Sequence, residues 1–69
     1  MSADFGERVA RLRKDKRLTQ AALADVLGVS QSTIAKYETG EHTPKISKLS
    51  LLARTLDVTV DELIDSKSA

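Results

Sequence analysis

The sequence contains no cysteine, one histidine (His42) and two aromatic residues, Phe5 and Tyr37. Without cysteine, a chain forms no disulfide bond, no thiolate zinc site and no cysteine nucleophile. One imidazole is too few for a histidine-based metal site, so we expect no metal and no other cofactor. Two aromatic rings are too few for RNA-binding modules that stack several bases on aromatic side chains. These absences argue against an enzyme and favour a small binding domain.

Long apolar runs are also absent. No stretch approaches the roughly 20 apolar residues of a membrane-spanning helix, and the first residues do not read as the apolar region of a signal peptide. We therefore expect a cytoplasmic protein without membrane contact. The 69 residues suffice for one domain. We place this domain at 1–69 with its core at about 5–64, and residues 65–69 fit either a frayed terminus or the stub of a linker.

Start and stop signals divide the chain into five predicted helices. Three residues are placed to accept a hydrogen bond from a free amide at a helix start: Thr19, Ser30 and Thr59. Glu62 completes a capping box with Thr59, because it lies three residues further on. Gly28 and Gly40 stand where helices end in the left-handed conformation. The predicted helices span about 4–16, 20–27, 31–39, 45–56 and 60–65.

Apolar residues recur at helical spacing within these segments and predict one shared core. The residues predicted to face it are Phe5, Val9, Leu12, Leu23, Ala24, Leu27, Ile34, Tyr37, Ile46, Leu49, Leu52, Ala53, Leu56, Val58, Leu63 and Ile64. No segment alternates apolar and polar residues for long enough to predict a sheet. The sequence therefore predicts an all-α, compact five-helix bundle.

Two charged residues occupy positions where helical spacing predicts burial. Arg13 lies eight residues after Phe5, and Glu38 lies four residues after Ile34. A buried charge without a partner is costly, so we predict that Arg13 and Glu38 pair and join the first helix to the third. The alternative is that both side chains extend to solvent along their aliphatic stems.

The spacing between Gln20 and Tyr37 predicts a specific arrangement of two helices. Ala24, the fifth residue of this stretch, is small enough for the helices to cross closely, and Gly28, the ninth, can adopt a positive φ. The residues that hold both helices on a common core are Leu23, Leu27, Val29, Ile34 and Tyr37. The pattern indicates a helix-turn-helix formed by the second and third helices. In this motif the second of the two helices enters the DNA major groove.

The segments 18–24 and 28–34, the stretch Tyr37-Glu38-Thr39-Gly40 and Pro44 together resemble the lambda-repressor-like, Cro-type helix-turn-helix family. The resemblance covers about residues 5–64. Two departures concern the ends of the fourth helix: Asp57 stands where many members have glycine, and Lys45 where many have a serine or threonine cap. The resemblance implies a DNA-binding domain of the lambda-repressor type from a prokaryotic or phage-infected cell.

By similarity to the family, the exposed face of the third helix carries the base-contacting residues Gln31, Ser32 and Lys36, with Thr33 as a secondary candidate. Glutamine can bond adenine and lysine can reach guanine in the major groove. The implied phosphate-contacting residues are Gln20, Thr39, Thr43 and Lys45. The alternative for each residue alone is an ordinary solvated or capping role.

Charge is unevenly distributed along the chain. Residues 1–48 carry nine basic and six acidic residues (+3), and residues 49–69 carry two basic and four acidic residues (−2), which sum to the net charge of +1. Such a small positive excess predicts few phosphate contacts and weak binding by a monomer. We therefore expect a homodimer, as is usual for this motif. Leu51, Val60 and Ile64 form a possible dimer patch, the alternative being that they are scattered surface residues.

These features predict a transcriptional regulator, in the first place a repressor, that binds a palindromic double-stranded DNA operator as a dimer. The alternative is a helix-turn-helix scaffold that binds a protein partner, as an antitoxin or a co-regulator would. The sequence shows no catalytic nucleophile paired with a general base, no metal-binding cluster and no phosphate-binding loop, so nothing supports an enzyme.

Overall fold

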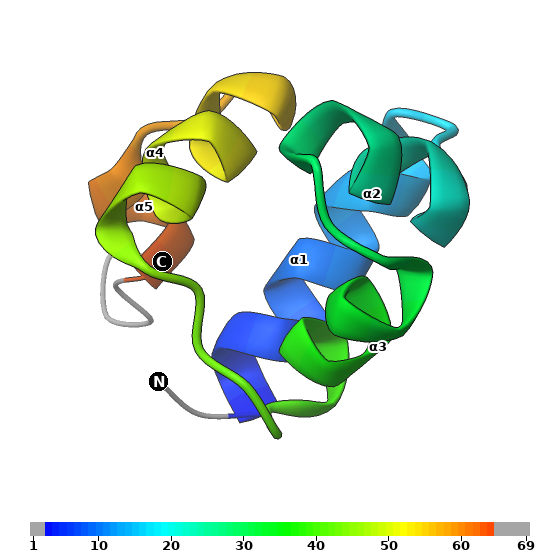
Figure 1. Cartoon of the computed structure of the whole chain (residues 1–69). Helices are drawn as coiled ribbons and strands as arrows, with labels where there is room; N and C mark the ends of the chain where they lie inside the picture. The colour runs from blue at the N-terminus through cyan, green and yellow to red at the C-terminus, as the bar shows by residue number, and fades with distance from the viewer. Residues whose placement is uncertain (1–2, 65–69) are drawn as a thin grey trace.

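The computed structural model describes residues 3–64, which form five α-helices and no strand. The helices are α1 (Ala3–Asp15), α2 (Gln20–Leu27), α3 (Gln31–Thr39), α4 (Ile46–Thr55) and α5 (Val60–Ile64). α1 lies in the middle, with α2 and α3 on one side and α4 and α5 on the other (Figure 1). The predicted all-α fold is confirmed, and the predicted helix bounds differ from the observed ones by one residue or agree with them. Residues 65–69, which include the predicted last residue of the fifth helix, lie outside the described part.

The hydrogen bonds predicted for the three N-cap residues are all present. Thr19 Oγ1 accepts from the Ala22 amide at 3.0 Å, and Ser30 Oγ accepts from the Thr33 amide at 3.1 Å. Before α5, the Glu62 amide donates to Thr59 Oγ1 at 3.0 Å while the Thr59 amide donates to Glu62 Oε1 at 2.9 Å. These bonds satisfy amides that the helices themselves leave unpaired.

The two predicted glycine helix ends are confirmed, and a non-glycine residue follows a third helix in the same left-handed conformation. Gly28 and Gly40 adopt φ values of 71° and 83° after α2 and α3. Asp57, which follows the end of α4, also adopts a positive φ of 64° without being glycine. Aspartate enters this region more readily than bulky residues do. Lys45 precedes α4 without capping it through its side chain.

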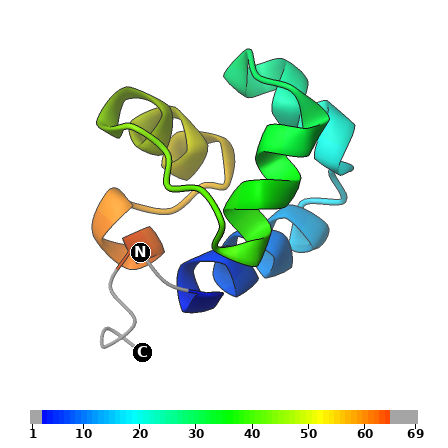
Figure 2. The ribbon, with the colours of Figure 1, turned by 60° about the horizontal axis from the view of Figure 1, so that its bottom comes forward.

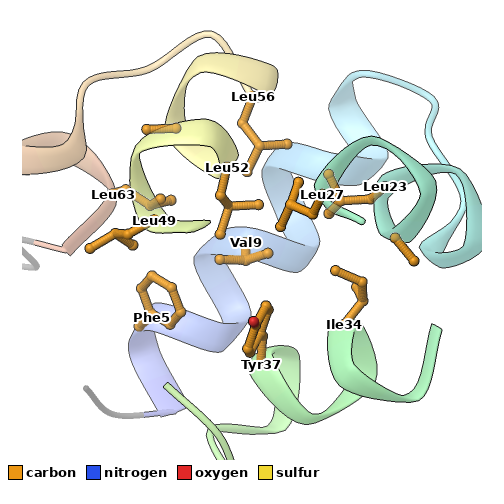
Figure 3. Packing of buried hydrophobic residues seen from close by; sticks show 12 residues of the cluster. Phe5, Val9, Leu23, Leu27, Ile34, Tyr37, Leu49, Leu52, Leu56 and Leu63 are labelled. Atoms are coloured by element: carbon orange, nitrogen blue, oxygen red, sulfur yellow. The ribbon is translucent and has the colours of Figure 1, made fainter. Parts of the chain in front are cut away.

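The core is a single cluster of buried apolar side chains contributed by all five helices. Val9 is fully buried in the middle of it, and Leu27 and Leu52 approach it from α2 and α4 (Figure 3). The core prediction is wrong for Ile46, which is 72% exposed. The helix begins at this residue, one turn before the buried stripe, which starts at Leu49. The prediction for Ile64 is also wrong, because this residue at the end of α5 remains 40% exposed.

Side-chain donors on α1 and α4 fasten the ends of other helices. Arg8 Nη1 donates to the Leu63 carbonyl at 2.7 Å, which ties α1 to α5. Lys48 Nζ donates to the Leu27 carbonyl at 2.7 Å, which ties α4 to the end of α2. Each bond satisfies a carbonyl in the last turn of a helix and places a positive charge at the negative end of its dipole. No helix within residues 3–64 has the length and apolar character needed to cross a membrane.

Gly6 allows α1 and α3 to approach closely. A β-carbon at this position would overlap the carbonyl group of Glu38 and lie 2.7 Å from the carbonyl oxygen of Tyr37. Both obstacles are backbone atoms, which cannot move away as the end of a flexible side chain can. The sequence pattern gave no sign of this contact, because it depends on the position of another helix.

We predict that Gly6→Ala destabilises the protein by about 1–3 kcal/mol, because overpacking outweighs the gain of about 1 kcal/mol in helix propensity. Urea denaturation measures the change. Ser50→Ala, at an exposed position within α4, is the matched control and should be neutral or slightly stabilising. A Gly6→Ala protein more stable than the wild type would show that the helices separate without cost.

Candidate nucleic-acid interface

α2 and α3 are joined by the short turn Gly28-Val29-Ser30. The Gly28 amide contacts the carbonyls of Ala24 and Asp25, and the Val29 amide donates to the Ala24 carbonyl at 3.0 Å. Ala24 itself is buried, as close crossing of the helices requires. Figure 2 shows α3 lying across α1, with α2 beside the N-terminal end of α3. The inner face of α3 is therefore fixed on two helices, and its outer face remains accessible.

The predicted base-contacting residues lie on this outer face. Gln31, Ser32 and Lys36 are exposed, and Thr33 is half-buried. The hydroxyls of Ser32 and Thr33 both contact Ser30 Oγ, at 3.0 and 2.9 Å. The sequence identified Ser30 as a cap but missed these contacts.

Tyr37 belongs to the opposite, inner face of α3. It is 5% exposed and extends toward Val9 (Figure 3). Burial raises the pKa of its phenol above the ordinary value of 10.0, because the charged form loses solvation. Tyr37 is thus a neutral core residue.

The predicted pair of Arg13 and Glu38 is present. Arg13 Nε lies 2.6 Å from Glu38 Oε2, and Arg13 Nη2 lies 3.2 Å from Glu38 Oε1. Arg13 Nη1 also donates to the Leu18 carbonyl at 2.8 Å, so each nitrogen of the guanidinium has an acceptor. Arg13 is 8% exposed. The pair joins α1 to α3 and to the loop that precedes α2.

The ion pair continues into the candidate interface through two glutamines. Gln20 Nε2 donates to Glu38 Oε1 at 3.0 Å, and Gln31 Nε2 lies 3.5 Å from Gln20 Oε1. An ionised carboxylate only accepts, so it draws the NH₂ group of Gln20 toward itself and leaves the Gln20 carbonyl for Gln31. Gln31 then retains one N–H and its carbonyl for an outside partner. Sequence reasoning missed this chain of contacts. The available signal is that Gln20 and Gln31 begin the two helices of the helix-turn-helix.

The predicted phosphate-contacting residues lie at the start of α2 and at or beyond the C-terminal end of α3. Gln20, half-buried at the start of α2, contacts both Gln31 in the first turn of α3 and Glu38 in its last turn. Thr39, Thr43 and Lys45 lie at or beyond the C-terminal end and are exposed. The Thr39 hydroxyl donates to the Lys36 carbonyl at 3.2 Å, so its proton is already in use within the helix. The structure therefore brings Gln20 together with Gln31 and Glu38, and it places the other three residues at the end of α3 or in the segment after it.

The predicted dimer patch is partly covered. Leu51 and Val60 are half-buried against the core, and Ile64 is 40% exposed. A surface hollow between α4 and α5 includes Val60 and is lined by Ser50, Ala53, Arg54, Asp57, Val58, Thr59, Val60 and Glu62. Within residues 3–64, no group of three or more histidine or acidic side chains could hold a metal ion.

Comparison with known proteins places this geometry in a described family. A family model for the helix-turn-helix matches residues 9–63. The transcriptional repressor RstR of cryptic phage CTXphi, from Vibrio cholerae, is 42% identical over 57 residues, which are 83% of this chain and 51% of RstR. The chain spans between 31% and 51% of the length of the first curated relatives.

Solved structures agree with the family model. The P22 c2 repressor in complex with a synthetic operator has a TM-score of 0.85 and 34% identity, over 88% of this chain and 92% of the repressor chain. The complex of the proteins SinR and SinI contains a chain with a TM-score of 0.83 and 33% identity, over 91% of this chain and 62% of that one. Among these relatives, RstR is described as a transcriptional repressor, and SinR has also been solved in complex with DNA.

We predict strong energetic coupling between Arg13 and Glu38. Arg13→Met or Glu38→Leu alone should destabilise by about 3–5 kcal/mol because each leaves an unpaired buried charge, whereas the double variant should recover much of that loss. A double-mutant cycle measured by urea denaturation gives the coupling.

The exposed pair Lys16 and Asp57, 3.4 Å apart, provides the control. Its cycle, with Lys16→Met and Asp57→Asn, should give less than about 1 kcal/mol of coupling because solvent screens the charges. Additive effects at Arg13 and Glu38 would contradict the prediction.

Proposed function

We propose that this chain, which belongs to the helix-turn-helix family of DNA-binding transcription regulators, represses transcription by binding a specific double-stranded DNA site with α3 in the major groove. One observation carries this proposal. Gln31, exposed at the start of α3, is oriented through Gln20 by the buried carboxylate of Glu38. A relative described as a transcriptional repressor and another solved on a synthetic operator support it.

The geometry of α3 suits direct reading of base edges. Adenine presents an N–H donor at N6 beside an acceptor at N7, and Gln31 retains the complementary carbonyl and N–H. Lys36, more than one turn further along the exposed face, can donate to guanine O6 or N7. Ser32 and Thr33 add hydroxyls beside Gln31. We assign Gln31, Ser32 and Lys36 as the main base contacts and Thr33 as a secondary one.

Phosphate contacts from the start of α2 and from the end of α3 and the segment after it would fix the register of the protein on DNA. Gln20 has a second amide hydrogen for a phosphate after donating the first to Glu38. Thr43 and Lys45 are exposed on the segment after α3. Thr39 can contribute only if its hydroxyl leaves the Lys36 carbonyl, so we rank it below the others.

We further propose that two copies bind a palindromic operator in the cytoplasm of a prokaryotic or phage-infected cell. The net charge of one copy is only +1, so two copies on adjacent half-sites would supply the affinity that one lacks. Half-sites read by this motif are about 34–36 Å apart. Leu51, Val60 and Ile64 form the candidate contact between copies, since they lie on α4 and α5 and are incompletely covered.

A second candidate function is recognition of a protein partner. SinR, similar in fold and sequence to this chain, has been solved in complex with SinI. In this alternative, duplex DNA binding would be weak and without sequence preference. The polar character of Gln31, Ser32 and Lys36 favours DNA over an apolar protein surface.

Selection from a random duplex pool at about 150 mM salt tests the main proposal. We predict a palindromic consensus, and we expect Gln31→Ala/Lys36→Ala to lose or change it and to bind the wild-type site at least about tenfold more weakly. Arg11→Ala, which removes one exposed charge from α1, is the control and should keep the consensus. A consensus unchanged in the double variant would remove both residues from the reading surface. No consensus from folded protein would favour the protein-partner function.

We also predict that Ile64→Asp shifts the dimer equilibrium toward monomer, because a charge on a contact between copies loses solvation. Sedimentation at micromolar concentration without DNA measures this shift. Ile46→Asp is the matched control, since Ile46 is 72% exposed and outside the patch. Equal behaviour of the two variants would exclude the patch as the dimer contact.

A further inference from the structure

Ser30 is the common partner of three groups at the start of α3. Its Oγ accepts from the Thr33 amide at 3.1 Å and lies 3.0 Å from Ser32 Oγ and 2.9 Å from Thr33 Oγ1. Ser32 and Thr33 are residues that the proposed function places on DNA. The contacts of Ser30 therefore belong to the candidate DNA-binding site and do not form a second site.

Counting protons limits how these hydroxyls can be arranged. A serine hydroxyl has one hydrogen to donate and two lone pairs to accept with. The Thr33 amide occupies one lone pair of Ser30, which leaves one lone pair and one hydrogen for two hydroxyl partners. When all three contacts are made, one of Ser32 and Thr33 donates to Ser30 and the other accepts from it.

The two arrangements present opposite groups to DNA. If Ser32 donates to Ser30, only its lone pairs face outward, while Thr33 keeps its hydrogen for an outside acceptor. If Thr33 donates to Ser30, the roles are exchanged. We propose that Ser30 is a positioning residue that makes the hydrogen-bond polarities of Ser32 and Thr33 toward DNA opposite and interdependent. This inference rests on the proposed function.

The consequence is a base preference that Ser32 does not set alone. Outward lone pairs suit adenine N6 or cytosine N4, whereas an outward O–H suits guanine O6 or N7, adenine N7 or thymine O4. A phosphate only accepts, so a Thr33 hydroxyl that donates to phosphate commits Ser32 to accepting from a base. Gln31 differs, because the carboxylate of Glu38 fixes its polarity through Gln20. The base opposite Gln31 therefore provides an internal reference.

Relative affinities for operators that vary at the position affected by Ser32→Ala test this inference. We expect the wild type to favour its selected base by about three- to tenfold, the scale of one hydrogen bond. Ser30→Gly removes the hydroxyl at little cost to the N-cap, and Thr33→Val removes the second hydroxyl. Both should reduce the preference to less than about twofold, because Ser32 can then donate or accept freely. The matched variants Ser30→Thr and Thr33→Ser keep the hydroxyls and should keep the preference.

The ratio between operators separates this role from a structural one. Loss of folded protein lowers affinity for every operator equally, so it leaves the ratio unchanged, and the preference opposite Gln31 should persist in all variants. If Ser30→Gly and Thr33→Val keep the wild-type ratio, or if Ser32→Ala changes no base preference, the inference is overturned while the proposed function stands. If the wild type prefers no sequence at all, the proposed function itself fails.

Discussion

The buried ion pair between Arg13 and Glu38 is the interaction on which the arrangement of the candidate interface depends. It joins α1 to α3, and Arg13 also holds the loop before α2 through the Leu18 carbonyl. The carboxylate of Glu38 can only accept, so its second neighbour, the amide of Gln20, has to donate. The charge thus orients Gln20, which in turn orients Gln31. Apolar residues of similar volume could replace the packing of this pair but would leave both glutamine amides free to rotate.

Glu38 meets α1 in two ways. Its side chain contacts Arg13, and its backbone carbonyl lies against Gly6, which precedes Arg13 by two turns of α1. The first contact is polar and directional, whereas the second depends only on the absence of a side chain. Together they set both the distance and the relative position of α1 and α3. Since interiors are packed densely, a change in this distance would be transmitted to the neighbours of α3.

The sequence predicted those features that depend on local chemistry. The caps at Thr19, Ser30 and Thr59 and the glycine ends follow from backbone geometry over a few residues, and the helical spacing identified most of the core. Ile46 was misassigned because spacing does not say where along a helix the core begins. Gly6 and the link from Gln20 to Gln31 were missed because each needs a neighbouring helix in place. The pair of Arg13 and Glu38 was found despite its separation in sequence, because each charge interrupts an apolar stripe and burial demands a partner.

The start of α3 therefore carries two kinds of polar group. A buried charge sets the hydrogen-bond polarity of Gln31. If the amide of Gln31 were reversed, its carbonyl oxygen would face the carbonyl oxygen of Gln20, and neither could donate. The hydroxyls of Ser32 and Thr33 exchange roles by rotation alone, at almost no cost in the free protein. A small net charge limits the affinity that phosphates can supply regardless of sequence. Discrimination between DNA sequences then rests on hydrogen bonds to the base edges. The base opposite Gln31 has to match a fixed donor and acceptor pattern. The base opposite Ser32 has to match a pattern that depends on the group that Thr33 contacts.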